Sequence, residues 1–421
     1  MTWTHPFFQA GTKRIYLLFA LMLGCIGVAD SMMGYVAPVF IEEMVGSATV
    51  MGIVLSTSSM IGICMDFFFA KFFPSKKSSF FLFLLFSMVF FFPLSFLLSR
   101  SPWGALIGMA VWGVYFEALV FSNFHAIHET VRPEDHSWAW GMTSVVRGIS
   151  WSIGPLLAST LLGSGERVPL YFSLVIYALA VGVGSLFILA QKTSTEHRKV
   201  VFHETASRSF GEEIGLWKTY ARTLWPLLIL NMLFYVIESA FFSVGPLLGE
   251  HLKSIHPLGG LFVSIYSVPG IFLGFFVGGL AKPFGKKRLS YLAGGIAGVG
   301  LMSIMFASNP FAILWWVFFA SVGLGLLHPA LSAVFEDFVA RSKEFGTDLV
   351  GLAAMSGSFA YIIGPLINGF LTDVVGEKAV FGIWGAVIFF YSILLWKLVH
   401  RKVRLPQAEA ELVVAAAEIG R

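Results

Sequence analysis

Five ionisable residues lie near the centres of long apolar runs, where a charge is costly. They are Asp30, Glu117, Arg147, Glu238 and His328. A charged side chain in the middle of a bilayer costs at least ~2.5–3.5 kcal/mol on insertion scales, so such residues are candidates for function. Carboxyl and imidazole groups in a partly dehydrated environment can bind and release protons near neutral pH. The five residues therefore suggest proton transfer and the binding of a polar solute within a membrane.

Asp30 and Glu238 are the leading candidates for proton coupling, and Glu117 and His328 are further candidates. The alternative for either acid of the first pair is a permanently ionised partner of Arg147, or a carboxyl group bonded to the backbone. His328 precedes a proline, which within a helix leaves a backbone carbonyl free. A neutral imidazole at this kink could relay protons or bind substrate, or it could bond to a neighbouring helix.

Glu117 and Arg147 could meet across adjacent helices and form either an ion pair or a clamp for a polar or anionic substrate. Trp151 lies one helical turn beyond Arg147, on the same face. The alternative is a salt bridge that packs the two helices together. Single polar side chains in apolar runs often serve helix–helix bonding, so they are weaker candidates for substrate contact. They are Asn123, Asn231, Tyr235 and Asn368, followed by His125, Tyr266 and Tyr361.

The composition of the chain excludes a water-soluble fold. Of its 421 residues, 57% are hydrophobic and only 12% are charged, and the mean hydropathy is +0.80. A helix needs about 20 apolar residues to cross a hydrocarbon core ~30 Å thick. Cys25 and Cys64 both lie inside apolar runs, so they cannot form a disulfide framework or a metal site. The sequence predicts an all-α polytopic membrane protein without a metal or a cofactor.

Twelve apolar runs are long enough to cross the membrane as helices. They cover residues 15–41, 48–70, 79–98, 103–127, 138–163, 169–190, 224–248, 257–281, 289–307, 311–335, 348–372 and 379–399. A charged segment separates the first six runs from the last six, and residues 209–222 within it could form an amphipathic helix at the membrane surface. We predict a six-helix bundle over 1–190, a linker over 191–222, a second six-helix bundle over 223–400 and a tail over 401–421.

Lysine and arginine residues gather in the cytoplasmic loops of membrane proteins. If the N-terminus is cytoplasmic, the loops on the other side carry only Arg100, Arg167, Lys253 and Lys378. All other cationic residues, except Arg147 within a span, then face the cytoplasm, together with both termini, the linker and the tail. We expect a multi-pass protein of the cell (inner) membrane that binds lipid and does not bind nucleic acid.

The two halves of the chain resemble each other. Gly154-Pro155 recurs as Gly364-Pro365, and Asp30-Ser31 recurs as Glu238-Ser239 at nearly the same spacing. Two similar offsets in separate helices indicate a duplicated six-helix unit. In a parallel repeat of this kind, a binding site is expected near the membrane midplane between the halves.

Two predicted loops contain glycines followed by charged residues. In the first, Gly62 and Asp66 precede three lysines, and in the second, Gly278, Lys282 and Gly285 precede Lys286, Lys287 and Arg288. Here the chain resembles the major facilitator superfamily, whose loop motif is Gly-x-x-x-Asp-Arg/Lys-x-Gly-Arg/Lys-Arg/Lys. The first copy continues with phenylalanines after the Asp, and the second has Lys282 in its place. Gly154-Pro155 is similar to the superfamily's Gly-Pro signature on helix five, which is most developed in antiporters.

The resemblance implies two six-helix bundles in which helices one, four, seven and ten line a central cavity and helices two, five, eight and eleven flank it. All five ionisable candidates would then lie on or beside that cavity. The resemblance also implies residues that switch the protein between conformations, namely Gly62, Asp66, Gly154, Pro155, Gly278, Lys282, Gly285, Lys286, Gly364 and Pro365. The implied partners are a small-molecule substrate and protons, bound by a functional monomer.

These features favour a secondary transporter that moves a small solute by alternating access and is driven by protons. Uptake by symport and export of a drug or metabolite by antiport are both compatible with the same acids. The sequence lacks a phosphate-binding loop of the Gly-x-x-x-x-Gly-Lys-Ser/Thr type, which argues against an ATP-driven pump. The alternatives from other classes are a membrane enzyme acting on lipid-linked substrates and a sensor or scaffold without turnover.

Overall fold

The computed structural model describes residues 10–73, 76–131, 135–193, 210–342, 345–399 and 406. Every regular element in these ranges is a helix. The chain divides into two compact units, Met1–His203 and Glu204–Arg421, and their boundary falls inside the predicted linker 191–222. Of the predicted tail 401–421, only Pro406 lies within the described ranges.

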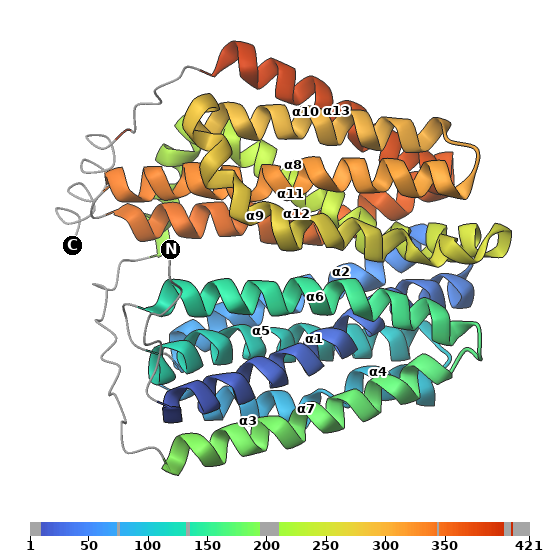
Figure 1. The fold of residues 1–421 in the computed structure, drawn as a ribbon, viewed down its shortest axis with the longest axis vertical. Coiled ribbons are helices and arrows are strands. Elements are labelled where there is room, and N and C mark those ends of the chain that lie inside the picture. The colour runs from blue at the N-terminus through green and yellow to red at the C-terminus, as the bar shows by residue number, and fades with distance from the viewer. Residues whose placement is uncertain are drawn as a thin grey trace. The chain divides into compact units, whose positions relative to one another are not determined.

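The N-terminal unit is a bundle of helices, coloured blue to green in Figure 1. In lipid, a helix satisfies its own backbone polar groups, which is why each long apolar run adopts this form. α1 packs along α6 and α7, and α5 packs against α2, α3 and α4. The described helices are α1 (Ala10–Val45), α2 (Ala48–Phe72), α3 (Ser78–Met88), α4 (Phe91–Leu98), α5 (Pro102–Thr130), α6 (His136–Leu162) and α7 (Val168–Thr193).

The third membrane span is broken into two helices. α3 ends at Met88 and α4 begins at Phe91. Pro93 has no backbone N–H and cannot bond to the carbonyl of Val89, so the helical hydrogen bonds are interrupted here. The two pieces together still cover one span, Ser78–Leu98.

The C-terminal unit repeats this plan. Its first helix, α8, packs along α12 and α13, as α1 packs along α6 and α7. α10 packs against α11 and α13, and α9 packs against α11. The described helices are α8 (Phe210–Ile255), the short 3₁₀ helix η2 (Pro257–Leu261), α9 (Phe262–Phe284), α10 (Lys286–Phe306), α11 (Pro310–Ser342), α12 (Gly346–Val375) and α13 (Glu377–Leu398).

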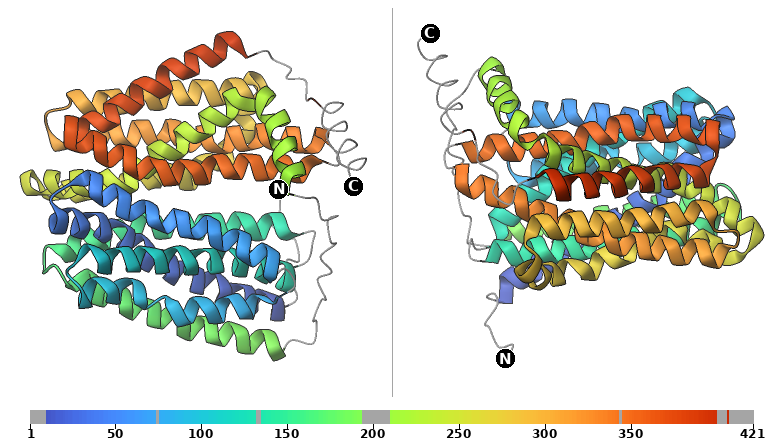
Figure 2. Two further views of the ribbon diagram at one scale, coloured as in Figure 1. Left: turned by 180° about the vertical axis from the view of Figure 1, so that it is seen from behind. Right: turned by 90° about the horizontal axis from the view of Figure 1, so that it is seen from above.

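α8 is a single helix of 46 residues. The sequence suggests that residues 209–222 could form an amphipathic helix at the membrane surface. The helix that starts at Phe210 includes this segment and continues without a break into the seventh span. Pro226 lies inside α8, and a proline within a helix removes one hydrogen bond and bends the axis. The light green start of α8 runs at a slant to its later part in Figure 2.

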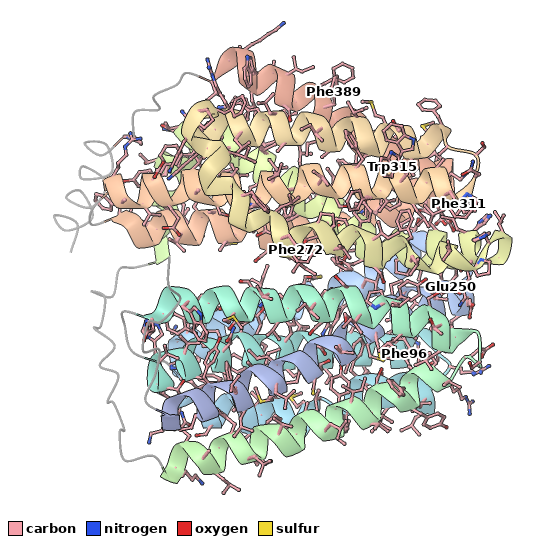
Figure 3. All side chains as sticks on the ribbon, viewed as in Figure 1. Phe96, Glu250, Phe272, Phe311, Trp315 and Phe389 are labelled. Atoms are coloured by element: carbon pink, nitrogen blue, oxygen red, sulfur yellow. The ribbon has the colours of Figure 1, made fainter. Side chains whose placement is uncertain are left out.

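The prediction of twelve membrane-spanning helices is confirmed within the described residues, where twelve helices are long and apolar enough to cross a membrane. Large apolar side chains cover their outer faces: Leu98 is 83% exposed and Phe306 is 81% exposed. Phe311 and Trp315, labelled in Figure 3, are 58% and 63% exposed. Such surfaces are stable in lipid and not in water.

Two connections in the C-terminal unit consist of one glycine each. Gly285 joins α9 to α10 with φ +80°, and Gly376 joins α12 to α13 with φ +86°. These backbone angles strain any residue with a Cβ atom, which explains why glycine occupies both turns.

Candidate functional site

Asp30 lies in the core of the N-terminal unit. Its Oδ1 atom accepts hydrogen bonds from the hydroxyl of Tyr115 on α5, at 2.8 Å, and from the hydroxyl of Tyr177 on α7, at 2.6 Å. The two hydroxyl oxygens are 3.2 Å apart. Asp30 is 2% exposed, and both tyrosines are fully buried. The two donors offset part of the cost of burying a carboxyl group, and the carboxyl group ties three helices together.

Glu238, the residue that matches Asp30 in the repeat, is also held by two tyrosines. Tyr361 on α12 donates to Oε2 at 2.5 Å, and Tyr266 on α9 donates to Oε1 at 3.4 Å. Glu238 is half-buried, in contrast to Asp30. The ring of Tyr266 stacks on Phe241 at a centroid distance of 3.9 Å, which fixes the tyrosine in place.

A second polar contact lies beside Glu238. The hydroxyl of Tyr235 and Nε2 of His328 are 3.1 Å apart and share a hydrogen bond. The ring of Tyr235 lies 5.6 Å from the ring of Tyr361, the partner of Glu238. We call Tyr235, Glu238, Tyr266, His328 and Tyr361 the Glu238 cluster. It draws on α8, α9, α11 and α12 within one unit.

Local packing explains why α8 presents these groups on one face. Tyr235 and Glu238 are three residues apart, and Asn231 lies one turn earlier, so all three share a face of the helix. A Cβ at Gly357 of α12 would approach the Tyr235 ring to 2.7 Å, so the glycine makes room for the tyrosine. Asn231 donates to Ser356 at 2.9 Å and to the carbonyl of Ala353 at 3.2 Å. These contacts tie the polar face of α8 to α12.

The repeated Gly-Pro pairs lie where α1 crosses α6 in one unit and where α8 crosses α12 in the other. A Cβ at Gly154 would collide with Ser31, and a Cβ at Gly364 would collide with Ser239. Ser31 donates to the carbonyl of Ser150 at 2.9 Å, whereas Ser239 accepts from Asn368 at 3.0 Å. The two copies therefore occupy matching positions in packing as well as in sequence.

Asn368 is fully buried, and its two polar atoms are occupied by protein groups. Besides Ser239, it donates to the carbonyl of Val236 and accepts from Trp384 at 2.7 Å. In the N-terminal unit, Asn123 is 4% exposed, and its Oδ1 has no hydrogen-bond partner among the described residues. His125 stacks on Phe81 at 5.4 Å. These side chains lie inside their units.

The structure does not join Glu117 to Arg147. Glu117 lies against α2, where a Cβ at Gly62 would come within 3.2 Å of its Oε1. Arg147 is exposed on α6 and has no ion pair with any described residue. The expected ion pair between the two is thus not found in the described structure. Trp151 is half-buried one turn beyond Arg147.

The loop motif residues take different environments. Asp66 lies close enough to Glu117 for their carboxyl groups to interact electrostatically, so Gly62, Asp66 and Glu117 form one group at the contact of α2 and α5. Lys286 donates to Asp337 of α11 at 2.6 Å and to the carbonyl of Ala333 at 3.3 Å.

Lys282 and Gly278 are exposed on α9. Gly270, Gly274 and Gly278 form an open stripe, since a Cβ on any of them would meet no atom within 4 Å. Pro155 and Pro365 lie inside α6 and α12, next to the glycines at the crossings. A face of small residues of this kind lets another helix approach closely.

Several partners were not foreseen from the sequence. Tyr115 and Tyr177 hold Asp30, and Asp337 holds Lys286, but none of the three was singled out. A tyrosine within a span is a weak signal because its ring is apolar and its hydroxyl can bond to any helix nearby. Among the described residues there is no group of three or more His, Cys, Asp or Glu that could hold a metal ion.

The fold and the buried acids define a polytopic membrane protein with polar groups at membrane depth, and comparison with known proteins gives its family. The model of the Major Facilitator Superfamily matches residues 19–341 and 227–417. The chain belongs to this superfamily of membrane transporters.

Two curated relatives are multidrug resistance proteins. Multidrug resistance protein 2 of Bacillus subtilis (strain 168) is 26% identical over 248 residues, which is 57% of this chain. The match spans 59% of the length of that relative. Multidrug resistance protein MdtG of Citrobacter koseri is 22% identical over 316 residues, which is 72% of this chain and 74% of the relative.

Solved structures with the same fold are transporters. The nucleoside transporter NupG has a TM-score of 0.70 at 12% identity and covers 92% of this chain and 100% of its own. The human organic anion transporter MFSD10 has a TM-score of 0.61 at 17% identity, with the same coverage. At these identities the likeness establishes the fold.

Proposed function

We propose that this transporter exports small drug-like solutes in exchange for protons, and that Glu238 is the group that takes up and releases the coupling proton. The observation that carries this proposal is the Glu238 cluster. A half-buried glutamate at membrane depth is costly when ionised, and Tyr266 and Tyr361 supply hydroxyl donors that offset this cost. The acid can therefore hold a charge in one state and a proton in another.

The names of the two relatives support export as the direction. Both are called multidrug resistance proteins, although the first aligns over only 59% of its own length. Aromatic rings surround Glu238, and an acid within aromatic rings suits an aromatic or lipophilic cation. In antiport, such a cation and a proton would compete for the same carboxyl group.

Asp30 has a different role in this proposal. It is 2% exposed and bonded to two fully buried tyrosines, so we assign it to holding α1, α5 and α7 together. Trp151 remains our candidate for contact with a cationic solute in the N-terminal unit. Arg147 is exposed and has no acidic partner among the described residues, so it would repel a cation and suits only an anionic or polar solute. Movement of the two units about a midplane site completes the cycle.

The topology belongs to the same proposal. The distribution of Lys and Arg supports both termini on the cytoplasmic side of the inner membrane of a bacterium. The Glu238 cluster is complete within one chain, which supports a functional monomer. Reporter fusions after Leu398 and within Ser99–Ser101 would then report opposite sides of the membrane.

The test uses purified protein in vesicles that carry a pH-sensitive dye. A fluorescent aromatic cation such as ethidium is added, and both proton movement and cation movement are followed. Glu238→Gln should lose proton-driven cation accumulation. Exchange of labelled for unlabelled cation needs no net proton transfer, so it should persist, but with a weaker apparent affinity because the amide cannot pair with the cation. Asp30→Asn is the matched control, because an asparagine oxygen can still accept from both tyrosines, and it should keep both activities.

Each other outcome contradicts a stated part of the proposal. If Asp30→Asn also loses proton coupling, both repeat-related acids carry protons. If the cation and the proton move in the same direction, the protein is a symporter. If cations bind but none of them moves in wild type, the protein is a sensor or scaffold.

A further inference from the structure

A groove lies between α10 and α13 of the C-terminal unit, away from the Glu238 cluster. Its volume is about 480 Å³. Its walls are almost entirely apolar, with Ile296 and Val299 on α10 and Phe389 on α13, which is labelled in Figure 3. Ile296 is 37% exposed and Val299 is 39% exposed, so the groove opens on an apolar outer face of the helix pair.

Three glycines of α10 create the groove. A Cβ at Gly298 would approach the carbonyl of Gly385 and the Cβ of Phe389 to 2.7 Å, and a Cβ at Gly294 would collide with Ser392. These two positions bring α13 close to α10. Gly295, by contrast, lines the groove, and a Cβ there would meet no atom within 4 Å. The missing side chain at Gly295 is what leaves the space open.

Cationic side chains lie at one end of the groove, where α10 begins and α13 ends. Lys397 is part of its lining, and the guanidinium of Arg288 lies 5.2 Å from the ring centre of Trp396, another lining residue. The neighbouring Lys286 is neutralised by Asp337, but neither Arg288 nor Lys397 has an acidic partner among the described residues. Tryptophan with Lys or Arg is typical of the headgroup level of a membrane.

Two buried hydroxyl groups in the lining have no hydrogen-bond partner within the described structure. They belong to Tyr291, which is 4% exposed, and Ser392, which is 2% exposed. The nearby Tyr391 differs, since it donates to the carbonyl of Pro226 at 2.9 Å. Both hydroxyl oxygens are enclosed by protein, and Ser392 faces Gly294 of α10, so they belong to the helix packing behind the groove and leave its walls apolar.

We propose that this groove binds an anionic phospholipid, with one acyl chain along the apolar walls and the phosphate at Arg288 and Lys397. Charge complementarity favours this occupant. Arg288 and Lys397, which have no acidic partner among the described residues, attract an anionic headgroup and repel the lipophilic cations that the Glu238 cluster suits. The site is separate from the proposed transport path and does not depend on it.

The test measures lipid binding to the purified full-length protein in detergent by native mass spectrometry, with dioleoyl phosphatidylglycerol and dioleoyl phosphatidylcholine as probes. Wild type should bind the anionic lipid more tightly than the zwitterionic lipid. The double variant Arg288→Gln/Lys397→Gln should bind phosphatidylglycerol about 30-fold more weakly, the factor that two basic contacts to anionic lipid supply, with phosphatidylcholine unchanged. The control Lys71→Gln removes an exposed cation of the N-terminal unit and should change neither affinity.

A second variant tests the acyl chain site without altering charge. Gly295→Leu fills open space, so it should fold normally and should weaken both lipids. Equal binding of the two lipids to wild type, or unchanged binding to Gly295→Leu, overturns the proposal. Displacement of phosphatidylglycerol by inorganic phosphate at millimolar concentration also overturns it, because the site would then bind a free anion and not a lipid.

Discussion

Asp30 and Glu238 occupy matching positions in two repeated units, yet their surroundings differ. Both carboxyl groups accept hydrogen bonds from two tyrosine hydroxyls. Asp30 is 2% exposed, and its tyrosines come from α5 and α7. Glu238 is half-buried, its tyrosines come from α9 and α12, and the polar contacts beside it continue to Tyr235 and His328. One acid is enclosed, and the other belongs to an extended cluster.

The helix crossings next to these acids have changed much less. Ser31 lies on Gly154 in one unit, and Ser239 lies on Gly364 in the other. The comparison teaches that the backbone packing of a duplicated unit can be retained while its acids acquire different partners. Glutamate is one methylene longer than aspartate, which carries its carboxyl group further from the helix axis. The tyrosines that bond to the two acids also lie on different helices of the two units.

The largest effect is expected from substitutions at the two helix crossings, and it shows whether the crossings at Gly154 and Gly364 are equally tight. In Gly154→Ala the new Cβ meets the backbone carbonyl of Val28 and the amide nitrogen of Met32 as well as Ser31, whereas in Gly364→Ala it mainly meets the side chain of Ser239, which can rotate. We expect a loss in the free energy of unfolding of about 3 kcal/mol for Gly154→Ala and about 1 kcal/mol for Gly364→Ala. Thermal unfolding in detergent measures both.

The control for these variants is Gly274→Ala, which adds a Cβ in open space on α9 and should leave the melting temperature unchanged. Equal destabilisation at Gly154 and Gly364 would contradict the inference that the crossing at Gly154 is the tighter of the two.

The second effect concerns the acids themselves. Asp30→Ala leaves the hydroxyls of Tyr115 and Tyr177 buried with only each other as partners, and should lower the free energy of unfolding by about 2 kcal/mol. Glu238→Ala removes a half-buried group and should cost less than about 1 kcal/mol. The two variants are compared by denaturation in mixed micelles. A larger loss for Glu238→Ala would contradict the assignment of Asp30 as the enclosed, structural acid.

The third effect separates stability from transport. Tyr177→Phe removes one of the two donors to Asp30 and should cost about 1 kcal/mol of stability while leaving cation transport intact. Tyr361→Phe removes the shorter bond to Glu238 and should slow proton-coupled transport with little change in melting temperature. Both variants are assayed in the same vesicles. If both substitutions lower stability and neither slows transport, Tyr361 has no role in proton coupling and the proposed difference between the two acids is wrong.

The smallest effect is expected at the ion pair of Lys286 and Asp337, whose side chains are 40% and 53% exposed. Exposed pairs contribute about 0.2–1 kcal/mol, so a double-mutant cycle with Lys286→Met and Asp337→Asn should give a coupling energy in that range, reduced by added salt. Asp66 in the N-terminal unit has no such ion pair among the described residues, and Asp66→Asn should show no comparable dependence on salt.

The spans could be predicted from the sequence because the thickness of the membrane sets the length of an apolar run. The span predicted over residues 48–70 is observed at Ala48–Phe72, and the span predicted over 379–399 is observed at Glu377–Leu398. The start of α8 was harder, because the charged residues before Pro226 suggested a separate surface helix, and a proline does not reveal whether a helix stops or only bends.

The partners of the ionisable residues could be predicted only in part. Asp30, Glu238 and His328 stood out because charge at membrane depth is rare. An ion pair of Glu117 and Arg147 was one of two possibilities, and it is not found among the described residues, because the rotation of each helix about its axis decides which side chains meet. That rotation depends on small residues such as Gly62 on the neighbouring helix, and apolar sequences contain many such residues.

The single-glycine turn at Gly285 has a mechanical consequence. α9 ends at Phe284 and α10 begins at Lys286, so one residue forms the whole connection, and consecutive Cα atoms are only about 3.8 Å apart. The end of α9 and the start of α10 therefore cannot move far apart. Lys286, the first residue of α10, also donates to Asp337 on α11, so the ends of α9, α10 and α11 are held together at this corner of the unit.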